Sequence, residues 1–173
     1  MRRDGTLMFD DEIMNLARRV IEENLAAGRT VALAESCTGG LVAAALTEIP
    51  GSSEVFERGF VTYSNEAKLE SIGVNQDILE TFGAVSVAVA WAMAQGVLRN
   101  SLAEVAVAVT GVAGPGGGSE KKPVGTVVFA CASRNDDPSK VVADIKHFGD
   151  LGRSEIRRQA TLTALELLLP HHD

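Results

Sequence analysis

The sequence predicts an α/β fold, a three-layer α/β/α sandwich around one mixed five-stranded sheet. Short apolar runs at residues 30–34, 56–64 and 104–110 alternate with stretches of helical periodicity, which is typical of parallel strands joined by right-handed helical crossovers. Two further runs, 126–133 and 140–148, are separated only by a turn, so we expect antiparallel neighbours and a reversed fourth strand. With 173 residues, 46% of them hydrophobic, the chain suits one domain over residues 1–173.

Helical periodicity predicts the remaining elements. The predicted helices span, in chain order, residues 10–27, 41–46, 66–72, 76–82, 87–102 and 153–169. Gly28 ends the first helix as a C-terminal cap. Asn65 and Ser86 precede the third and fifth helices and are the predicted N-caps. Trp91 falls on the apolar stripe of the fifth helix, which predicts a core position for the indole and not a ligand platform.

Composition and charge restrict the partners. The formal charge of −7 and the pI near 5.0 repel phosphate backbones, so we expect no nucleic-acid partner. The apolar stretches are too short to cross a bilayer, and residues 1–6 lead into acidic residues, so we expect neither a membrane partner nor a signal peptide. Cys37 and Cys131 fit a reduced cytoplasmic protein better than a disulfide scaffold. A homo-oligomer is compatible with these properties.

The groups that can carry chemistry gather at the end of the first strand. The apolar run stops at Glu35-Ser36-Cys37-Thr38 and is followed by two glycines and a helix. At such a junction a serine hydroxyl can attack a carbonyl while N–H groups of the helix start receive the oxyanion. Ser36 is therefore the candidate nucleophile, and Thr38, Gly39 and Gly40 are candidate substrate-binding residues. In the alternative interpretation, Ser36 and Thr38 only cap the following helix.

A serine nucleophile needs a base, and the three histidines are poorly placed to supply one. His147 lies on the last predicted strand, and His171 and His172 lie in the C-terminal tail. A Ser-His-Asp triad is therefore disfavoured, and no Cys/His spacing suggests zinc or another metal. We expect no cofactor.

Lys68, in the first turn of the third helix, is the remaining candidate base. A lysine base must be neutral, which requires lowering its pKa by roughly 3 units, about 4 kcal/mol. The helix dipole contributes about 1 kcal/mol, so burial in a cleft would have to supply the rest. The alternative is a solvated surface lysine. Cys37 is a rival nucleophile, but on an extended strand end its side chain points opposite to that of Ser36, so only one can face the cleft.

A second glycine-rich turn, residues 111–125, follows the third strand. Because parallel neighbouring strands end at the same edge of a sheet, we expect this turn beside Gly39-Gly40, with a cleft between them. The turn lacks the phosphate-loop pattern, and Ser119 stands where a dinucleotide motif needs its third glycine. Its backbone N–H groups could still wrap a nucleotide, and Gly114 and Ser119 are the candidate contacts. The alternative is a flexible hairpin loop.

At these residues the sequence resembles the CinA C-terminal domain family, the nicotinamide-nucleotide amidases. The resemblance extends over nearly the whole chain and rests on separate blocks that occur in order: Ala34-Glu35-Ser36-Cys37-Thr38-Gly39-Gly40, Pro50-Gly51-Ser52-Ser53, Phe56 to Lys68, Gly83-Ala84-Val85-Ser86, Thr110 to Pro115, Lys122 to Val127 and Arg157-Arg158-Gln159-Ala160. It implies hydrolysis of nicotinamide mononucleotide to nicotinate mononucleotide and ammonia, in pyridine nucleotide recycling. The rival interpretation is a non-catalytic nucleotide-binding or regulatory module, associated with competence or the response to DNA damage.

The resemblance also implies roles for individual residues. Ser36 would be the nucleophile and Lys68 its base, while Tyr63 and Thr110 would position the pyridine amide and receive its oxyanion. An arginine near the start of the last helix would hold the phosphate. The sequence departs from the family here, because Gly149-Asp150-Leu151-Gly152-Arg153 stands where a Gly-Asp-Arg run is expected. We choose Arg153 for the phosphate, with Arg157 as the alternative.

Overall fold

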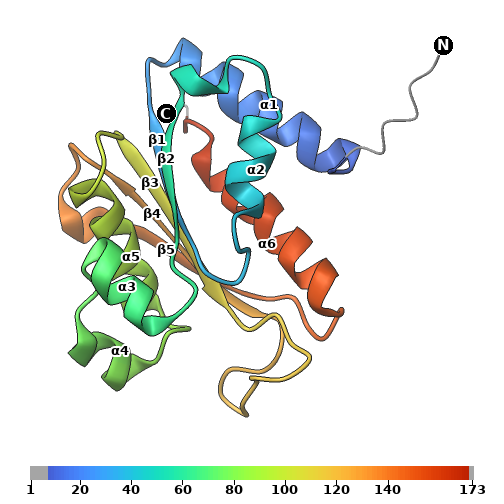
Figure 1. Cartoon of the computed structure of the whole chain (residues 1–173), viewed down its shortest axis with the longest axis vertical. Coiled ribbons are helices and arrows are strands. Elements are labelled where there is room, and N and C mark those ends of the chain that lie inside the picture. The colour runs from blue at the N-terminus through green and yellow to red at the C-terminus, as the bar shows by residue number, and fades with distance from the viewer. Residues whose placement is uncertain (1–7, 172–173) are drawn as a thin grey trace.

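One five-stranded sheet organises the computed structural model, which describes residues 8–171 (Figure 1). The strands are β1 (Val31–Glu35), β2 (Phe56–Val61), β3 (Val105–Gly111), β4 (Thr126–Ser133) and β5 (Val142–His147). Their order is β2-β1-β3-β4-β5, with β1 parallel to β2 and β3 and with β4 antiparallel to β3 and β5. The predicted mixed sheet with a reversed fourth strand is confirmed. Residues 1–6, on which the expectation of no signal peptide rests, and His172 lie outside the described residues.

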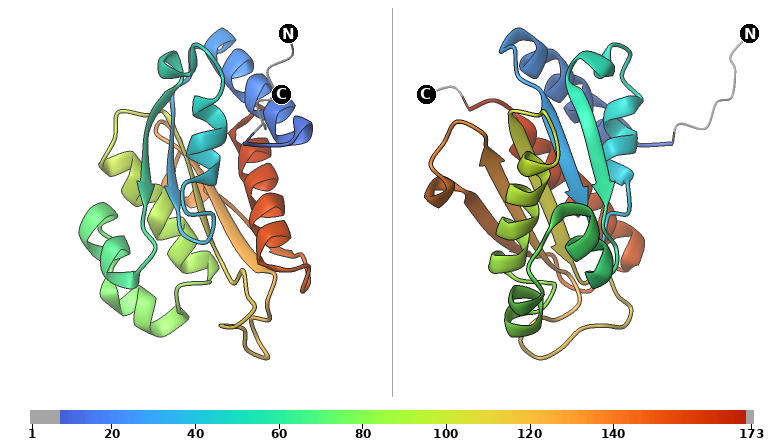
Figure 2. Two further views of the ribbon diagram at one scale, coloured as in Figure 1. Left: turned by 45° about the vertical axis from the view of Figure 1, so that its right-hand side comes forward. Right: turned by 60° about the vertical axis from the view of Figure 1, so that its left-hand side comes forward.

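Helices cover both faces of the sheet, as predicted (Figure 2). They are α1 (Asp11–Ala26), α2 (Leu41–Thr47), α3 (Asn65–Ile72), α4 (Gln76–Phe82), α5 (Val87–Arg99) and α6 (Arg153–Leu168), with short 3-10 turns at Ser52–Glu54 and Pro138–Lys140. On one face lie α1, α2 and α6; on the other lies α5, with α3 and α4 beside it. Within residues 8–171, no helix has the length and apolarity needed to cross a membrane.

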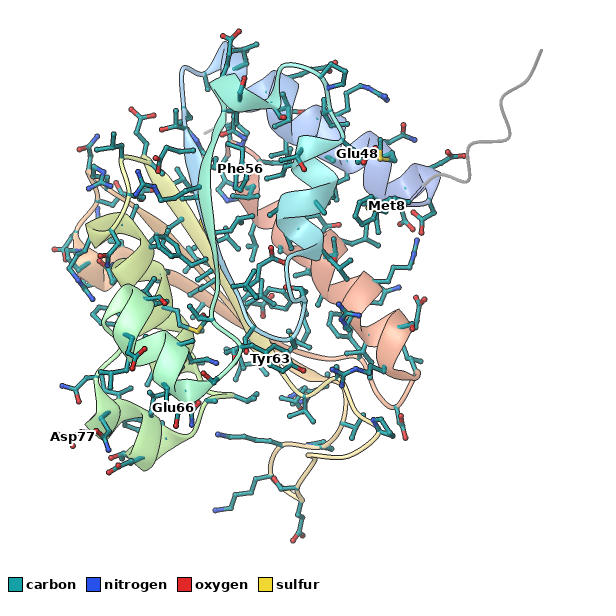
Figure 3. All side chains as sticks on the ribbon, viewed as in Figure 1. Met8, Glu48, Phe56, Tyr63, Glu66 and Asp77 are labelled. Atoms are coloured by element: carbon teal, nitrogen blue, oxygen red, sulfur yellow. The ribbon has the colours of Figure 1, made fainter. Side chains whose placement is uncertain are left out.

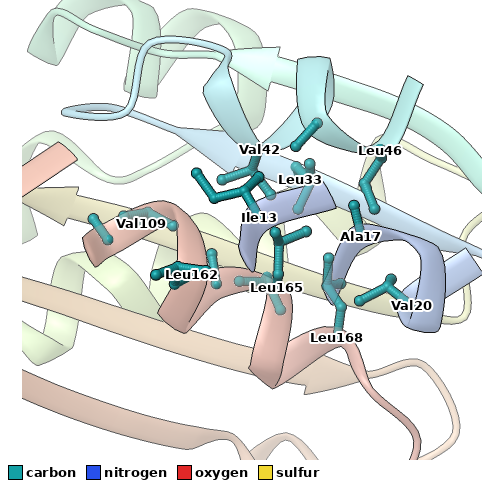
Figure 4. Close-up of a cluster of buried hydrophobic side chains, with 14 of the residues drawn as sticks. Ile13, Ala17, Val20, Leu33, Val42, Leu46, Val109, Leu162, Leu165 and Leu168 are labelled. Atoms are coloured by element: carbon teal, nitrogen blue, oxygen red, sulfur yellow. The ribbon is translucent and has the colours of Figure 1, made fainter. Parts of the chain in front are cut away.

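The two faces of the central strands contribute to two cores. Leu33 and Val109 pack with α1, α2 and α6 (Figure 4), whereas Ala34 and Ala108 pack with α5. This alternation follows from the period of two along a strand. Every residue of β1 is buried. Strands buried on both faces appear in sequence as continuous apolar runs, which is why β1 and β3 could be located from the sequence.

A close approach between α5 and α3 helps to place the site. A Cβ atom at Gly96 would lie 2.1 Å from the carbonyl oxygen of Ile72, the last residue of α3, so only glycine allows this contact. Because Lys68 lies on α3, this close packing is one of the contacts that position the helix carrying the amine.

Some element bounds and two details differ from the sequence-based expectations. The helix expected over 87–102 ends at Arg99, and the strands expected over 56–64 and 140–148 are shorter, at Phe56–Val61 and Val142–His147. Ser64, not Asn65, is the N-cap of α3: Ser64 is still extended, its Oγ accepts from the Ala67 N–H at 3.0 Å, and Asn65 is already helical. Trp91 is 37% exposed and donates its indole N–H to the Pro138 carbonyl at 3.2 Å. The fully buried residues of α5 centre on Met93, which leaves Trp91 at the margin of the apolar stripe.

Candidate active site

A cleft of about 280 Å³ opens where β1 and β3 end, between the turn at residues 36–40 and the loop after β3. Its walls consist of Ser36, Cys37, Tyr63, Lys68, Ala84, Val85, Thr110, Gly111, Val112, Ala113, Gly114, Gly116, Gly117 and Arg153. Figure 3 places Tyr63 at this end of the sheet, where the chain leaves β2. The two glycine-bearing turns therefore lie side by side at the predicted edge.

Lys68 is buried at the bottom of this cleft. Its side chain is 1% exposed, and its Nζ lies 3.1 Å from Ser36 Oγ. Burial lowers the pKa of the amine because the charged form loses its hydration. None of the ion pairs among residues 8–171 involves Lys68, and Glu66 on the same helix is exposed. No carboxylate therefore opposes the effect of burial by direct pairing.

The other contacts of the amine orient it toward Ser36. Nζ donates to the carbonyl oxygens of Thr62 at 2.8 Å and Tyr63 at 3.3 Å. A carbonyl can only accept, so these two contacts take two amine hydrogens. A neutral amine has only two hydrogens and one lone pair, and its third neighbour is the Ser36 hydroxyl. The lone pair of the neutral form therefore faces Ser36.

Ser36 is held at the first position of the turn that follows β1. Its N–H donates to the Val109 carbonyl at 2.9 Å, which ties the residue to β3. At Gly40, φ is +103°, a conformation that favours glycine and lets the chain enter α2 immediately. The side chain of Ser36 is 8% exposed.

Glu35 closes the other end of the turn and was not singled out from the sequence. Its buried carboxylate accepts from the N–H groups of Val42 at 2.9 Å and Ala43 at 3.1 Å. Because Gly40 has no side chain to cap α2, Glu35 serves as the cap. This corrects one expectation: the N–H groups at the start of α2 already have acceptors and do not receive an oxyanion. A carboxylate just before an uncapped helix is the signal that could have revealed this role.

Cys37 is a poor rival nucleophile. Its side chain belongs to the core under α1, α2 and α6. Burial raises the pKa of the thiol to about 12, so the thiol stays protonated near neutral pH. Lys68 Nζ contacts the Ser36 hydroxyl instead.

The outer wall of the cleft is polar and basic. Arg153 donates to the Gly114 carbonyl at 2.7 Å and to the Tyr63 hydroxyl at 2.9 Å. Thr110, by contrast, is buried deeper in the cleft, and its Oγ1 donates to the Ala84 carbonyl at 2.9 Å. The lining formed by the described residues contains the basic side chain of Arg153 and no carboxylate, which favours an anionic ligand. Among residues 8–171, no group of three or more His, Cys, Asp or Glu side chains could hold a metal ion.

Comparison with known proteins places this arrangement in a family. The protein-family model that describes the CinA C-terminal domain matches residues 13–171. The chain belongs to the CinA C-terminal domain family. It is 50% identical over 161 residues to the nicotinamide-nucleotide amidohydrolase PncC of Escherichia coli, covering 93% of this chain and 95% of that protein. It is 48% identical over 141 residues to a CinA-like protein of Syntrophobacter fumaroxidans, 82% of this chain but 32% of that protein.

A solved structure of the same kind agrees with the fold. The competence/damage inducible protein CihA of Agrobacterium tumefaciens superposes with a TM-score of 0.90 at 53% identity, covering 94% of this chain and 97% of that one. The family resemblance and the fold class expected from the sequence are both confirmed.

In this CinA domain, the predicted site residues divide into two groups. The cleft brings together Ser36, Lys68, Tyr63, Thr110, Gly114 and Arg153. It does not include Thr38, Gly39 or Gly40, which shape the turn behind it; the buried Thr38 hydroxyl has no partner among residues 8–171. Ser119 is exposed in the loop after β3, where it accepts from the Lys122 N–H at 3.1 Å. Arg157 contacts the turn and not the cleft.

Proposed function

We propose that this CinA domain is an amidohydrolase that converts nicotinamide mononucleotide to nicotinate mononucleotide and ammonia through a Ser36 acyl-enzyme, with Lys68 as base. The observation that carries the proposal is a buried lysine amine 3.1 Å from a serine hydroxyl in a cleft. The 50% identity to a protein named nicotinamide-nucleotide amidohydrolase supports the choice of substrate. The corresponding role is pyridine nucleotide recycling in the cytoplasm.

Acylation begins with the transfer of the hydroxyl proton from Ser36 to neutral Lys68. As Oγ bonds to the carboxamide carbon, the carbonyl π electrons move to oxygen and a tetrahedral intermediate forms. Lys68, now an ammonium, returns the proton to the amide nitrogen while the C–N bond breaks, and ammonia leaves. The carbonyls of Thr62 and Tyr63 accept from the amine in both protonation states, so its position need not change during the transfer.

Deacylation repeats the sequence with water. Lys68 takes a proton from water as the water oxygen attacks the ester carbon. Lys68 then gives this proton to the departing Ser36 oxygen. The product acid loses its proton to water and leaves as nicotinate mononucleotide, and both residues return to their starting states. One base therefore serves both half-reactions.

The hydrogen bonds of the other cleft residues support roles for them in binding the substrate. The one hydrogen of the Thr110 hydroxyl is donated to Ala84, so Oγ1 has lone pairs to accept from the carboxamide NH₂. The Tyr63 hydroxyl accepts from Arg153, which leaves its own hydrogen for a substrate oxygen. Arg153, at the mouth of the cleft, would bind the phosphate, and the backbone at Gly114 would line the nucleotide. A cleft of about 280 Å³ lies near the lower end of ligand pockets, about 300–1,000 Å³, which favours a mononucleotide over a dinucleotide.

The decisive experiment measures ammonia released from nicotinamide mononucleotide by the purified chain and by Ser36→Ala. We expect release by the wild type, none above background by Ser36→Ala, and similar nucleotide affinity for both by calorimetry. Release that survives in Ser36→Ala would make Cys37 the suspected nucleophile. Nucleotide binding by the wild type without ammonia release would indicate the non-catalytic module instead.

A further inference from the structure

Two arginines one helical turn apart on α6 do different things. Arg153 and Arg157 leave the same face of the helix, because residues four apart lie above one another. Arg153 reaches the cleft, but the guanidinium of Arg157 lies against the turn at residues 36–40. Arg157 Nε donates to the Cys37 carbonyl at 3.1 Å, and Nη2 donates to the Thr38 carbonyl at 3.2 Å.

The turn that receives these bonds is tied to the sheet at its first residue, where the Ser36 N–H donates to the Val109 carbonyl. Two of its five residues are glycines, which leave the backbone more freedom than any other residue. Within it, the Gly39 N–H donates to the Ser36 carbonyl, and the Leu41 N–H of α2 donates to Thr38. Glu35 holds the start of α2, beyond the turn. Arg157 is thus the side chain that binds the backbone of the turn between Ser36 and α2.

The two bonds fix the peptide planes that follow Ser36. In a trans peptide the N–H points opposite to the carbonyl, so a hold on the Cys37 carbonyl also sets the direction of the Thr38 N–H. That N–H has no acceptor among residues 8–171, in contrast to the satisfied N–H groups at the start of α2. A change in the Cys37–Thr38 peptide would turn this donor and move the adjoining Ser36.

We propose that Arg157 is a positioning residue for the nucleophile: its guanidinium holds the carbonyls of Cys37 and Thr38 so that Ser36 stays aligned with Lys68. The inference rests on the proposed function but adds a role that is separate from phosphate binding. It predicts that Arg157 affects the chemical step, whereas Arg153 affects binding of the substrate.

The kinetic test uses Arg157→Gln, Arg157→Lys and a matched control, Arg158→Gln. Arg158 is the next residue on α6, but it pairs with Asp10 and Glu12 near the start of α1, away from the cleft. For Arg157→Gln we expect kcat to fall about 10- to 100-fold, the effect of a misaligned reacting group, with KM within about twofold of wild type. Arg157→Lys should be intermediate, because the shorter ammonium keeps the charge but lacks the rigid planar fork that presents two N–H groups to the two carbonyls. Arg158→Gln should retain wild-type kcat.

Two further measurements do not depend on the substrate. The rate at which a fluorophosphonate labels Ser36 should fall in Arg157→Gln in parallel with kcat. Amide hydrogen exchange in a peptide that contains residues 36–41 should become faster in Arg157→Gln and Arg157→Lys, but not in Arg158→Gln. If Arg157→Gln does not fold, the lysine variant decides the question by the same readouts.

The outcomes separate the two proposals. An unlabelled wild-type Ser36 and no ammonia release would reject the proposed function, while exchange at residues 36–41 would still test the hold on the turn. Wild-type labelling and exchange in the Arg157 variants would reject the positioning role. A rise in KM alone would also reject it, because that result would assign Arg157 to the phosphate.

Discussion

The floor and the rim of the cleft differ in ways that match two different tasks. The floor, Ser36, Lys68 and Thr110, is buried and comes from the ends of the central strands and from a helix packed through Gly96. The rim, Tyr63, Arg153 and Gly114, lies at the edge of the sheet, at the start of α6 and in the loop after β3. Tyr63 is 60% exposed, whereas Lys68 is 1% exposed.

This difference shows where each kind of polar group can work. Burial makes the charged form of the Lys68 amine costly and so lowers its pKa toward that of a base near neutral pH, which is why Lys68 belongs on the floor. A cation that captures a dissolved anion must keep its charge and remain reachable, so Arg153 belongs on the rim. We therefore expect substitutions on the floor to lower kcat and substitutions on the rim to raise KM.

The largest effect is expected from Lys68→Met, which removes the base but keeps a long apolar side chain. We expect kcat to fall about 10²- to 10⁴-fold, the usual contribution of a general base. In the wild type, the rate of Ser36 acylation should rise with pH as the lowered pKa of Lys68 is passed, because only the neutral amine accepts the proton. Stopped-flow ammonia release across pH checks both; a flat profile in the wild type would contradict the role of Lys68.

The same variant gives a stability signature. Below the folded-state pKa of Lys68, the amine is charged in both the folded and the unfolded chain, so the full cost of burying a charge lowers the free energy of unfolding. Between that pKa and the ordinary value near 10.5, the unfolded chain binds more protons, so wild-type stability gains from this group as pH rises. The Tm of Lys68→Met relative to wild type should therefore decrease with pH over this range. A constant difference would mean that the pKa is not lowered by folding.

The next effect tests how the floor is positioned from a distance. In Gly96→Ala, the new Cβ would lie 2.1 Å from the Ile72 carbonyl oxygen, so α3 must retreat by about 1 Å, a misplacement that can cost about 10²-fold in rate. Alanine is favoured over glycine in a helix by about 1 kcal/mol, so in open space the change would stabilise the protein. We expect lower kcat and lower Tm together. A higher Tm with unchanged kcat would show that α3 is not held by this contact.

A smaller effect, on KM, is expected at the rim. Arg153→Gln should raise KM for nicotinamide mononucleotide about 10- to 100-fold, the value of one or two charge-assisted hydrogen bonds, with little change in kcat. Nicotinamide riboside, which lacks the phosphate, is the matched control. Turnover of the riboside should be the same in wild type and Arg153→Gln, so the variant should lose the preference for the phosphorylated substrate. An equal rise in KM for both substrates would show that Arg153 does not bind the phosphate.

The floor could be predicted from the sequence because its determinants are local. Continuous apolar runs marked β1 and β3, and the turn after β1 marked the edge where they end. The distance between Ser36 and Lys68 could not be predicted by spacing alone, since it depends on the packing of α3 against α5 and on Ser64 as the cap. The family resemblance supplied that pairing.

The rim and the Arg157 support of the turn were harder to predict because they depend on contacts distant in sequence. Glu35 has a local signal as the cap of α2, whereas Arg157 binds carbonyls 119 and 120 residues earlier, a relation that no local pattern encodes. Helical periodicity predicts a core position for Trp91, which is 37% exposed, because the pattern gives the face of a helix but not the width of its buried part. The conformation of the glycine-rich loop after β3 likewise could not be predicted from the sequence.

The smallest effect is expected at Ser119, where the sequence suggested a ligand contact. Its hydroxyl accepts from the Lys122 N–H, and Lys122 Nζ donates to the Phe82 carbonyl at 2.7 Å, so this part of the loop is tied to α4 and not to the cleft wall. In Ser119→Ala we expect kcat and KM within about twofold of wild type, the range of exposed substitutions away from a site. Parallel kinetics on nicotinamide mononucleotide and its riboside check this. A tenfold rise in KM for the nucleotide alone would extend the rim to this part of the loop, because only a contact with the phosphate distinguishes the two substrates.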